Sequence, residues 1–202
     1  REAVRSAILK LKEMLESAVD LKSVKGIFKF VAKKIPGLGT ALEIVDIGRM
    51  LQAMGARIEG LGSTTIMVEG VPRLHPVTHR TVPDRIVAGT WAFAAAVTGG
   101  RVEIVGAEPE HLDVVLAKLR CAGCEINTAD GRFVVRGPER PKAINVSTLP
   151  YPGFPTDLQP FVVALNAVAE GSGIITENVF EARWGFTAEL DRLGARVRLD
   201  GH

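Results

Sequence analysis

Residues 109–136, PEHLDVVLAKLRCAGCEINTADGRFVVR, decide the fold class of this chain. The first half predicts a helix over 109–122, because its apolar residues recur three and four positions apart. These apolar residues are Leu112, Val115, Leu116 and Leu119. The second half predicts strands at 124–128 and 132–136, which an Asp-Gly dipeptide joins as a hairpin. A helix followed by an antiparallel hairpin is typical of a mixed α/β fold.

Upstream of this stretch, helical and extended patterns alternate. Residues 84–98 predict a helix, and residues 101–105 predict a strand behind a Gly-Gly turn. Residues 40–54 predict a further helix, followed by short strands at 57–60 and 64–69. From the second of these short strands onward, the order is strand, helix, strand, helix, strand, strand.

The same order recurs downstream of the hairpin. We expect a strand at 143–147, a helix at 157–169, a strand at 173–177, a helix at 184–193 and a strand at 195–199. Matching landmarks of the two stretches fall about 70 residues apart, and a constant spacing indicates an internal repeat.

The repeat predicts an α/β (α+β) protein made of βαβαββ units behind an N-terminal helical segment. Residues 1–38 form that helical, lysine-rich segment. Residues 39–70 form a half unit of one helix plus a β-hairpin. Residues 71–202 form one complete and one nearly complete unit.

The 1–38 segment carries nine Lys or Arg and four Asp or Glu, a net charge of +5 against +2 for the whole chain. Its apolar residues predict amphipathic helices at 2–19 and 21–35. We expect their apolar faces to cover surface that a truncated unit leaves bare. The 21–35 helix has five Lys and no acidic residue, which is also typical of helices that bind anionic membranes or acidic partners. Arg and aromatic residues are too scarce here to favour nucleic acid.

The overall composition is that of a soluble globular protein, with 47% hydrophobic and 24% charged residues. No apolar run reaches the roughly 18 to 20 residues that span a bilayer. The chain starts at Arg1 without a signal-peptide pattern, from which we expect a cytoplasmic protein with a trimmed N-terminus.

Cys121 and Cys124 form a C-x-x-C, a pattern found in redox pairs and in metal sites. No second C-x-x-C and no neighbouring His accompanies it, so we interpret both as small residues at a helix–strand turn and leave a functional role open.

His75 and His79 lie four positions apart, but the prolines near them predict a loop or strand, and no third ligand is evident. We therefore predict no metal site.

Five stretches resemble the enolpyruvyl transferases, in the order and spacing of that family. They are EIVDIGRMLQAMGARIEGLGSTTIMVEGV (43–71), VPDRIVAGTWAFAAAVTGG (82–100), LDVVLAKLRCAGCEI (112–126), RPKAINVSTLPYPGFPTDLQ (140–159) and AEGSGIITENVFEARWGF (169–186). The strings PGFPTDLQ and ITENVFEAR are more similar to the branch that acts on UDP-N-acetylglucosamine than to the shikimate branch. Residues 1–38 match nothing in the family.

The resemblance implies two similar domains of βαβαββ units, with helices inside and sheets outside. It implies transfer of an enolpyruvyl group from phosphoenolpyruvate to the 3-hydroxyl of the sugar nucleotide, a step of peptidoglycan precursor synthesis. It implies no metal or redox cofactor.

The resemblance also implies roles for single residues. Asp157 matches the carboxylate that deprotonates the sugar hydroxyl, although Asp before an apolar run is also typical of a helix N-cap. Val179 and Phe180 match residues that line the sugar-nucleotide site. Arg183 matches a cleft arginine, and the alternative is a surface charge at the start of a helix. The two residues after it, Trp184 and Gly185, depart from the family pattern.

Two further carboxylates match less specific positions. Asp84 matches a carboxylate near the domain junction, and an N-cap behind Pro83 is an equal alternative. Glu43 stands where the family has an acidic pair, and Ala41 replaces the first member of that pair, so we expect a half-formed site there.

The family's reactive-cysteine loop, its Lys-Asn pair and its late arginine have no match here, although binding phosphoenolpyruvate needs several positioned cations. We therefore expect a truncated or chimeric chain, natural or engineered, that folds without turnover. One alternative is a residual, weak UDP-N-acetylglucosamine binder or half of a split transferase. Another is a membrane- or partner-binding protein that uses helix 21–35. An exposed strand edge also predicts a homodimer.

Overall fold

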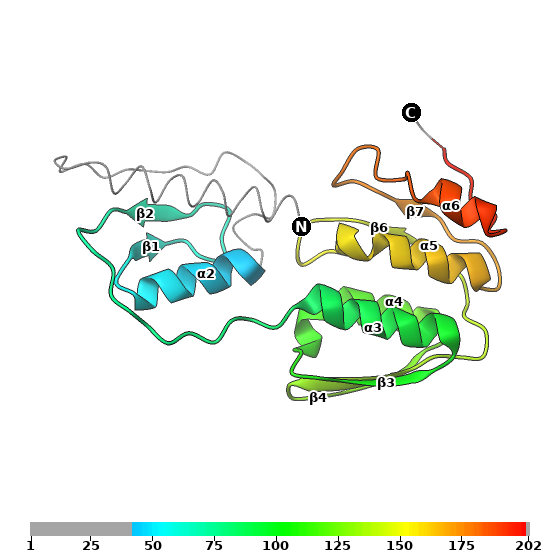
Figure 1. Cartoon of the computed structure of the whole chain (residues 1–202), viewed down its shortest axis with the longest axis horizontal. Helices are drawn as coiled ribbons and strands as arrows, with labels where there is room; N and C mark the ends of the chain where they lie inside the picture. The colour runs from blue at the N-terminus through cyan, green and yellow to red at the C-terminus, as the bar shows by residue number, and fades with distance from the viewer. Residues whose placement is uncertain (1–41, 201–202) are drawn as a thin grey trace. The chain divides into compact units, whose positions relative to one another are not determined.

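A computed structural model describes residues 42–200 (Figure 1). The helices predicted at 2–19 and 21–35, and the binding roles that depend on them, lie outside the described residues. The chain divides into two compact units, with the boundary between Thr81 and Val82. The finer domain limits predicted from the sequence stay a prediction. In the part of the chain that the structure describes, no helix is long and apolar enough to cross a membrane.

In the first unit, one helix packs beside a short hairpin. These elements are α2 (Leu42–Ala53), β1 (Arg57–Glu59) and β2 (Met67–Glu69). The strands are antiparallel, with Ile58 opposite Val68. Gly55 follows the helix with a φ of 98°, a left-handed conformation that glycine adopts without strain. His79 Nε2 lies 3.0 Å from Asp46 Oδ1 and so ties the loop after the hairpin to α2.

The second unit opens with two helices on a three-stranded antiparallel sheet. Its elements are α3 (Arg85–Thr98), β3 (Arg101–Val105), η2 (Pro109–Leu112), α4 (Asp113–Cys121), β4 (Glu125–Ala129) and β5 (Arg132–Arg136). The strand order is β3-β5-β4, so the predicted hairpin forms one side of the sheet. Leu112, Val115, Leu116 and Leu119 are all buried, which confirms the predicted apolar face.

A second helix–strand–helix run completes this unit. Its elements are β6 (Val146–Ser147), η3 (Thr156–Leu158), α5 (Gln159–Val168), β7 (Ile175–Thr176) and α6 (Thr187–Arg192). Strands β6 and β7 pair in parallel. Helix α3 contacts both its own sheet and α5, so it lies at the centre of the unit (Figure 1). The predicted mixed α/β class is confirmed.

Small side chains allow α3 to pack closely on two sides. Ala88, Ala92, Ala95 and Ala96 are buried along it. Phe93, on the same helix, stacks on Phe161 of α5 with ring centroids 6.2 Å apart. It also meets Phe154 edge to face at 6.5 Å. Aromatic pairs of this kind contribute about 0.5–1.5 kcal/mol beyond their buried area. Phe93 therefore links α3 to α5 and to the loop before η3.

Several predicted strands are shorter in the structure or absent from it; the strand at 64–69 is reduced to β2 and the strand at 173–177 to β7. The strand at 143–147 forms a ladder only at β6, because the side chain of Asn166 bonds both backbone groups of Ile144. The strand at 195–199 is wrong: this segment has no strand conformation, and no described strand pairs with it. An extended segment without a ladder partner cannot satisfy its backbone groups as a sheet does.

Three predicted helices begin later than expected, among them the helix at 157–169, whose first turn is the 3₁₀ turn η3. The first turn of the helix at 109–122 is the 3₁₀ turn η2, which contains Pro109. The helix predicted at 184–193 begins at Thr187, because residues 181–186 form turns instead. In these turns Ala182 has a φ of 55°, a conformation that costs a residue with a side chain about 1 kcal/mol or more.

Candidate active site

Residues 154–158, which include η3 and are called the site loop below, are held at both ends by buried side chains. Phe154 packs on α3, and Leu158 is fully buried against Gly89 of the same helix. Thr156 and Asp157 lie between these two anchors and are half-buried. Two buried apolar side chains therefore flank the two polar ones. This arrangement fixes the positions of the Thr156 hydroxyl and the Asp157 carboxylate at the surface.

Asp157 forms an ion pair with Arg183. Arg183 Nη2 lies 2.7 Å from Asp157 Oδ1, and Arg183 Nη1 donates to Thr156 Oγ1 at 3.0 Å. The two charged side chains are 32% and 31% exposed, so the pair is open to solvent on one side. The guanidinium also lies over the ring of Phe180, 5.3 Å from its centroid. One arginine thus connects three neighbouring groups.

Two alternatives from the sequence are wrong at this site. Asp157 is not an N-cap, because it lies within η3, whose cap is Pro155, and the cap of α5 is Leu158. Arg183 is not a surface charge at a helix start, because α6 begins four residues later and Arg183 turns back to Asp157. The two side chains bond each other, with Arg183 Nη2 2.7 Å from Asp157 Oδ1.

Beside this pair, the carboxylate of Glu177 accepts four hydrogen bonds. Its Oε1 accepts from Thr148 Oγ1 at 2.8 Å and from the backbone N–H groups of Val179 and Phe180 at 2.8 and 3.1 Å. Its Oε2 accepts from Thr156 Oγ1 at 2.7 Å. The Thr148 hydroxyl in turn accepts from Asn178 N at 2.8 Å. Glu177 therefore holds a tight turn against the end of β6.

That turn presents Val179 and Phe180 toward solvent. Each side chain is 37% exposed, and the backbone N–H group of each residue is held by Glu177 Oε1. The structure thus gathers Asp157, Val179, Phe180 and Arg183 in one cluster of the second unit. Their predicted roles toward substrate stay predictions.

Asp84 and Glu43 lie elsewhere. Asp84 is the N-cap of α3, with Oδ1 accepting from Ile86 N at 2.8 Å and Val87 N at 3.0 Å, so the capping alternative is confirmed. Glu43 lies in the first turn of α2, in the first unit, and its role at a substrate site stays a prediction.

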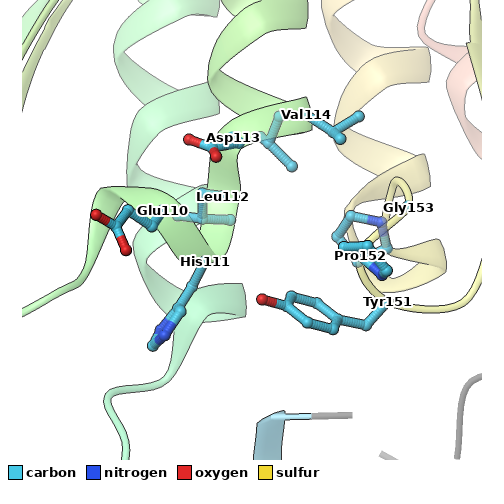
Figure 2. A pocket seen from close by; sticks show the side chains of 10 residues that line it. Glu110, His111, Leu112, Asp113, Val114, Tyr151, Pro152 and Gly153 are labelled. Atoms are coloured by element: carbon cyan, nitrogen blue, oxygen red, sulfur yellow. The ribbon is translucent and has the colours of Figure 1, made fainter. Parts of the chain in front are cut away.

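A surface hollow of about 240 Å³ adjoins the N-terminal end of the site loop (Figure 2). The rings of His111 and Tyr151 lie on opposite sides of it, below the first turn of α4. Arg85 lies over the Tyr151 ring, 5.1 Å from its centroid, and so joins the start of α3 to this loop. The hollow is lined by Glu110, His111, Leu112, Asp113, Val114, Val115, Tyr151, Pro152, Gly153 and Pro155.

The cysteines occupy the helix–strand turn predicted for them. Cys121 ends α4 and is exposed, whereas Cys124 precedes β4 and is buried; both are free thiols. Burial raises the pKa of the Cys124 thiol from 9.0 to about 11, so it carries little thiolate at neutral pH. Within residues 42–200, no group of three or more His, Cys, Asp or Glu side chains could hold a metal ion.

Sequence reasoning missed Glu177, Thr148 and Thr156. The strings around them carry the family resemblance, but their hydrogen bonds join positions 21 and 29 apart. Hydrophobic periodicity indicates only which residues within one or two helical turns or along one strand share a face. It therefore cannot predict contacts between residues so far apart in the sequence.

This architecture agrees with comparisons to known proteins. A profile of the family described as EPSP synthase (3-phosphoshikimate 1-carboxyvinyltransferase) matches residues 30–202, and the chain belongs to this family of enolpyruvyl transferases. It is 55% identical over 160 residues to the UDP-N-acetylglucosamine 1-carboxyvinyltransferase of Mycobacterium bovis and 57% identical to that of Corynebacterium jeikeium. The resemblance seen in the sequence is confirmed, but the expectation that residues 1–38 match nothing in the family is wrong for residues 30–38, which the family profile includes.

Each of these matches covers 79% of this chain and 38% of the relative. The crystal structure of the enolpyruvyl transferase NikO from Streptomyces tendae superposes with a TM-score of 0.66 at 30% identity, over 78% of this chain and 38% of that one. The chain therefore spans well under half the length of the relatives it matches.

Proposed function

We propose that residues 42–200 are the part of a UDP-N-acetylglucosamine 1-carboxyvinyltransferase that supplies the proton-accepting carboxylate and one wall of the sugar-nucleotide site. The observation that carries this proposal is the half-exposed Asp157–Arg183 pair beside the exposed side chains of Val179 and Phe180. The similarity to curated transferases of this name supports the same substrate class.

In this proposal, Asp157 takes the proton of the sugar hydroxyl, whose oxygen then becomes the nucleophile toward the enolpyruvyl group. A hydroxyl needs such a positioned base, because it is a weak nucleophile while it keeps its proton. Arg183 Nη2 lies 2.7 Å from Asp157 Oδ1. This contact keeps the carboxylate in a fixed orientation for the proton transfer.

Val179 and Phe180 would contact the sugar nucleotide through apolar surface. Burying one exposed apolar side chain contributes about 1 kcal/mol or more, which gives weak binding without the rest of a cleft. Two such side chains fall short of the roughly 4 kcal/mol that a millimolar Kd requires, so we expect this chain to bind UDP-N-acetylglucosamine no more tightly than about millimolar.

We propose that the 202-residue chain by itself does not turn over. Phosphoenolpyruvate carries a phosphate and a carboxylate, and holding both needs several positioned cations. In the described cluster around Asp157, the guanidinium of Arg183 is already engaged by Asp157 and Thr156. Phosphate release from phosphoenolpyruvate and UDP-N-acetylglucosamine by this chain alone would contradict this part of the proposal.

A two-dimensional amide NMR titration with UDP-N-acetylglucosamine tests the binding role. We expect shifts confined to residues near Asp157, Val179 and Phe180. Val179→Ala should weaken these shifts, whereas the matched variant Val105→Ala, at an exposed position on β3, should not. A dispersed spectrum that ignores the ligand at millimolar concentration would overturn the proposed binding wall.

A further inference from the structure

The carboxylate of Glu177 lies between the two halves of the proposed site. On one side it accepts the N–H groups of Val179 and Phe180, which carry the exposed apolar side chains. On the other side it accepts the hydroxyl of Thr156, next to Asp157. The carboxylate accepts four hydrogen bonds, about as many as a carboxylate accepts in all. These donors therefore set the orientation of the Glu177 side chain.

The direction of the hydrogen bonds links Glu177 to the ion pair. The Thr156 hydroxyl donates its proton to Glu177 Oε2, so its oxygen lone pairs face the other way and accept from Arg183 Nη1 at 3.0 Å. The second guanidinium nitrogen of Arg183 then meets Asp157 Oδ1. Because a hydroxyl has one proton, Glu177 decides which way Thr156 presents its acceptor.

We infer that Glu177 is a positioning residue that sets the turn carrying Val179 and Phe180 and, through Thr156, orients Arg183 against Asp157. This inference rests on the proposed function for its meaning in substrate recognition, but its geometry does not. Glu177 has no direct hydrogen bond to Asp157 among the described interactions, so it acts through Thr156 and Arg183 rather than on a substrate.

Two substitutions separate the two halves of this role. Glu177→Ala removes the acceptor for the backbone N–H groups and for Thr156. Glu177→Gln keeps one oxygen for the backbone N–H groups but presents an amide NH₂ to Thr156, which cannot accept that hydroxyl proton. Thr156→Val removes the hydroxyl that joins Glu177 to Arg183 but leaves the backbone N–H groups bonded to Glu177 Oε1, and Thr156→Ser keeps the hydroxyl.

The test uses the 202-residue chain without ligand, so its outcome does not depend on whether the chain binds UDP-N-acetylglucosamine. Amide hydrogen exchange at Val179 and Phe180 reports on the turn. The side-chain ¹⁵N resonances of Arg183 report on whether its guanidinium is held or rotates freely. A role limited to folding the turn would leave the Arg183 resonances unchanged.

We expect Glu177→Ala to accelerate exchange at both amides about tenfold, the effect of losing about one hydrogen bond, and to average the Arg183 resonances. Glu177→Gln and Thr156→Val should average the Arg183 resonances and change amide exchange less than about threefold. Thr156→Ser should restore the parent signals. The control Glu181→Gln removes a charge at a nearby exposed position and should change neither readout.

Separate Arg183 resonances in both Glu177→Gln and Thr156→Val would overturn the link to the ion pair. Unchanged amide exchange in Glu177→Ala would overturn the role in the turn. If Glu177→Ala loses its dispersed spectrum, the Thr156 variants still decide the link. Failure of the parent chain to bind UDP-N-acetylglucosamine, with these results intact, would count against the proposed function alone.

Discussion

Arg183 and Asp157 lie 26 positions apart in the sequence, yet Arg183 Nη2 comes within 2.7 Å of Asp157 Oδ1. The contact depends on η3 being anchored to α3 by Phe154 and Leu158, and on the turn at Glu177 bringing the chain back. The ion pair therefore depends on how two loops pack on α3. Substitutions that change this packing should also disturb the contact between Arg183 and Asp157.

Arg183→Met should lower the free energy of unfolding by about 1 kcal/mol, because Asp157 loses a half-buried ion pair and Thr156 loses a donor. Urea denaturation measures the change. The matched variant Arg192→Met breaks the 2.8 Å pair with Glu189, whose side chains are 77% and 68% exposed. It should cost less than about 0.5 kcal/mol. If both variants lost the same free energy of unfolding, the Asp157–Arg183 pair would contribute no more to stability than an exposed pair.

Gly89→Ala should destabilise the second unit by about 1–2 kcal/mol despite the better helix propensity of Ala. A Cβ at this position would overlap a methyl group of Leu158, which is fully buried, so the side chain has to shift within the core. The displaced η3 should also shift the amide signals of Thr156 and Asp157. Gly185→Ala is the control, because a Cβ there meets nothing within 4 Å. Thermal unfolding and an amide spectrum of each variant check both effects.

Asn166→Ala should cost about 2 kcal/mol, because the buried Ile144 would lose the partners of its backbone N–H and C=O groups. These bonds are 3.0 and 2.9 Å long and hold the start of β6 to α5. The surface variant Asn127→Ala, on β4, should be nearly neutral. The idea fails if both variants unfold at the same urea concentration.

The stability of the chain should fall as pH rises above about 9, through Cys124. Its thiol pKa is about 11 in the folded protein and near 9.0 when exposed, so only the unfolded chain ionises this thiol between these values. The stabilisation is fully present below pH 9 and is lost as pH rises toward 11, by about 3 kcal/mol at most. Cys124→Ala should remove this part of the pH dependence in urea denaturation at pH 8 and 10.

The two thiols should also differ in reactivity. At pH 8, iodoacetamide should modify the exposed Cys121 and spare the buried Cys124 while the chain is folded. Mass spectrometry after proteolysis locates the label. Equal labelling of both positions in the folded chain would contradict the burial of Cys124.

Local signals in the sequence located most of the elements. Asp84 predicted the start of α3, and the Asp-Gly dipeptide predicted the hairpin of β4 and β5. Capping and turn chemistry act within four residues, so such features can be read directly from the chain. The 143–147 strand could not be placed correctly in this way, because it depends on a side chain from α5.

The sequence by itself determined the mixed α/β class, the family and the identity of Asp157, Val179, Phe180 and Arg183 as residues of interest. Only the tertiary structure decided that Arg183 pairs with Asp157 and that Glu177 joins both loops. The physical reason is range: helix and strand periodicities, caps and turns are set by close neighbours. A charged network is set by the packing of α3 against α5 and the site loop, which brings residues 20 to 30 positions apart into hydrogen-bonding distance.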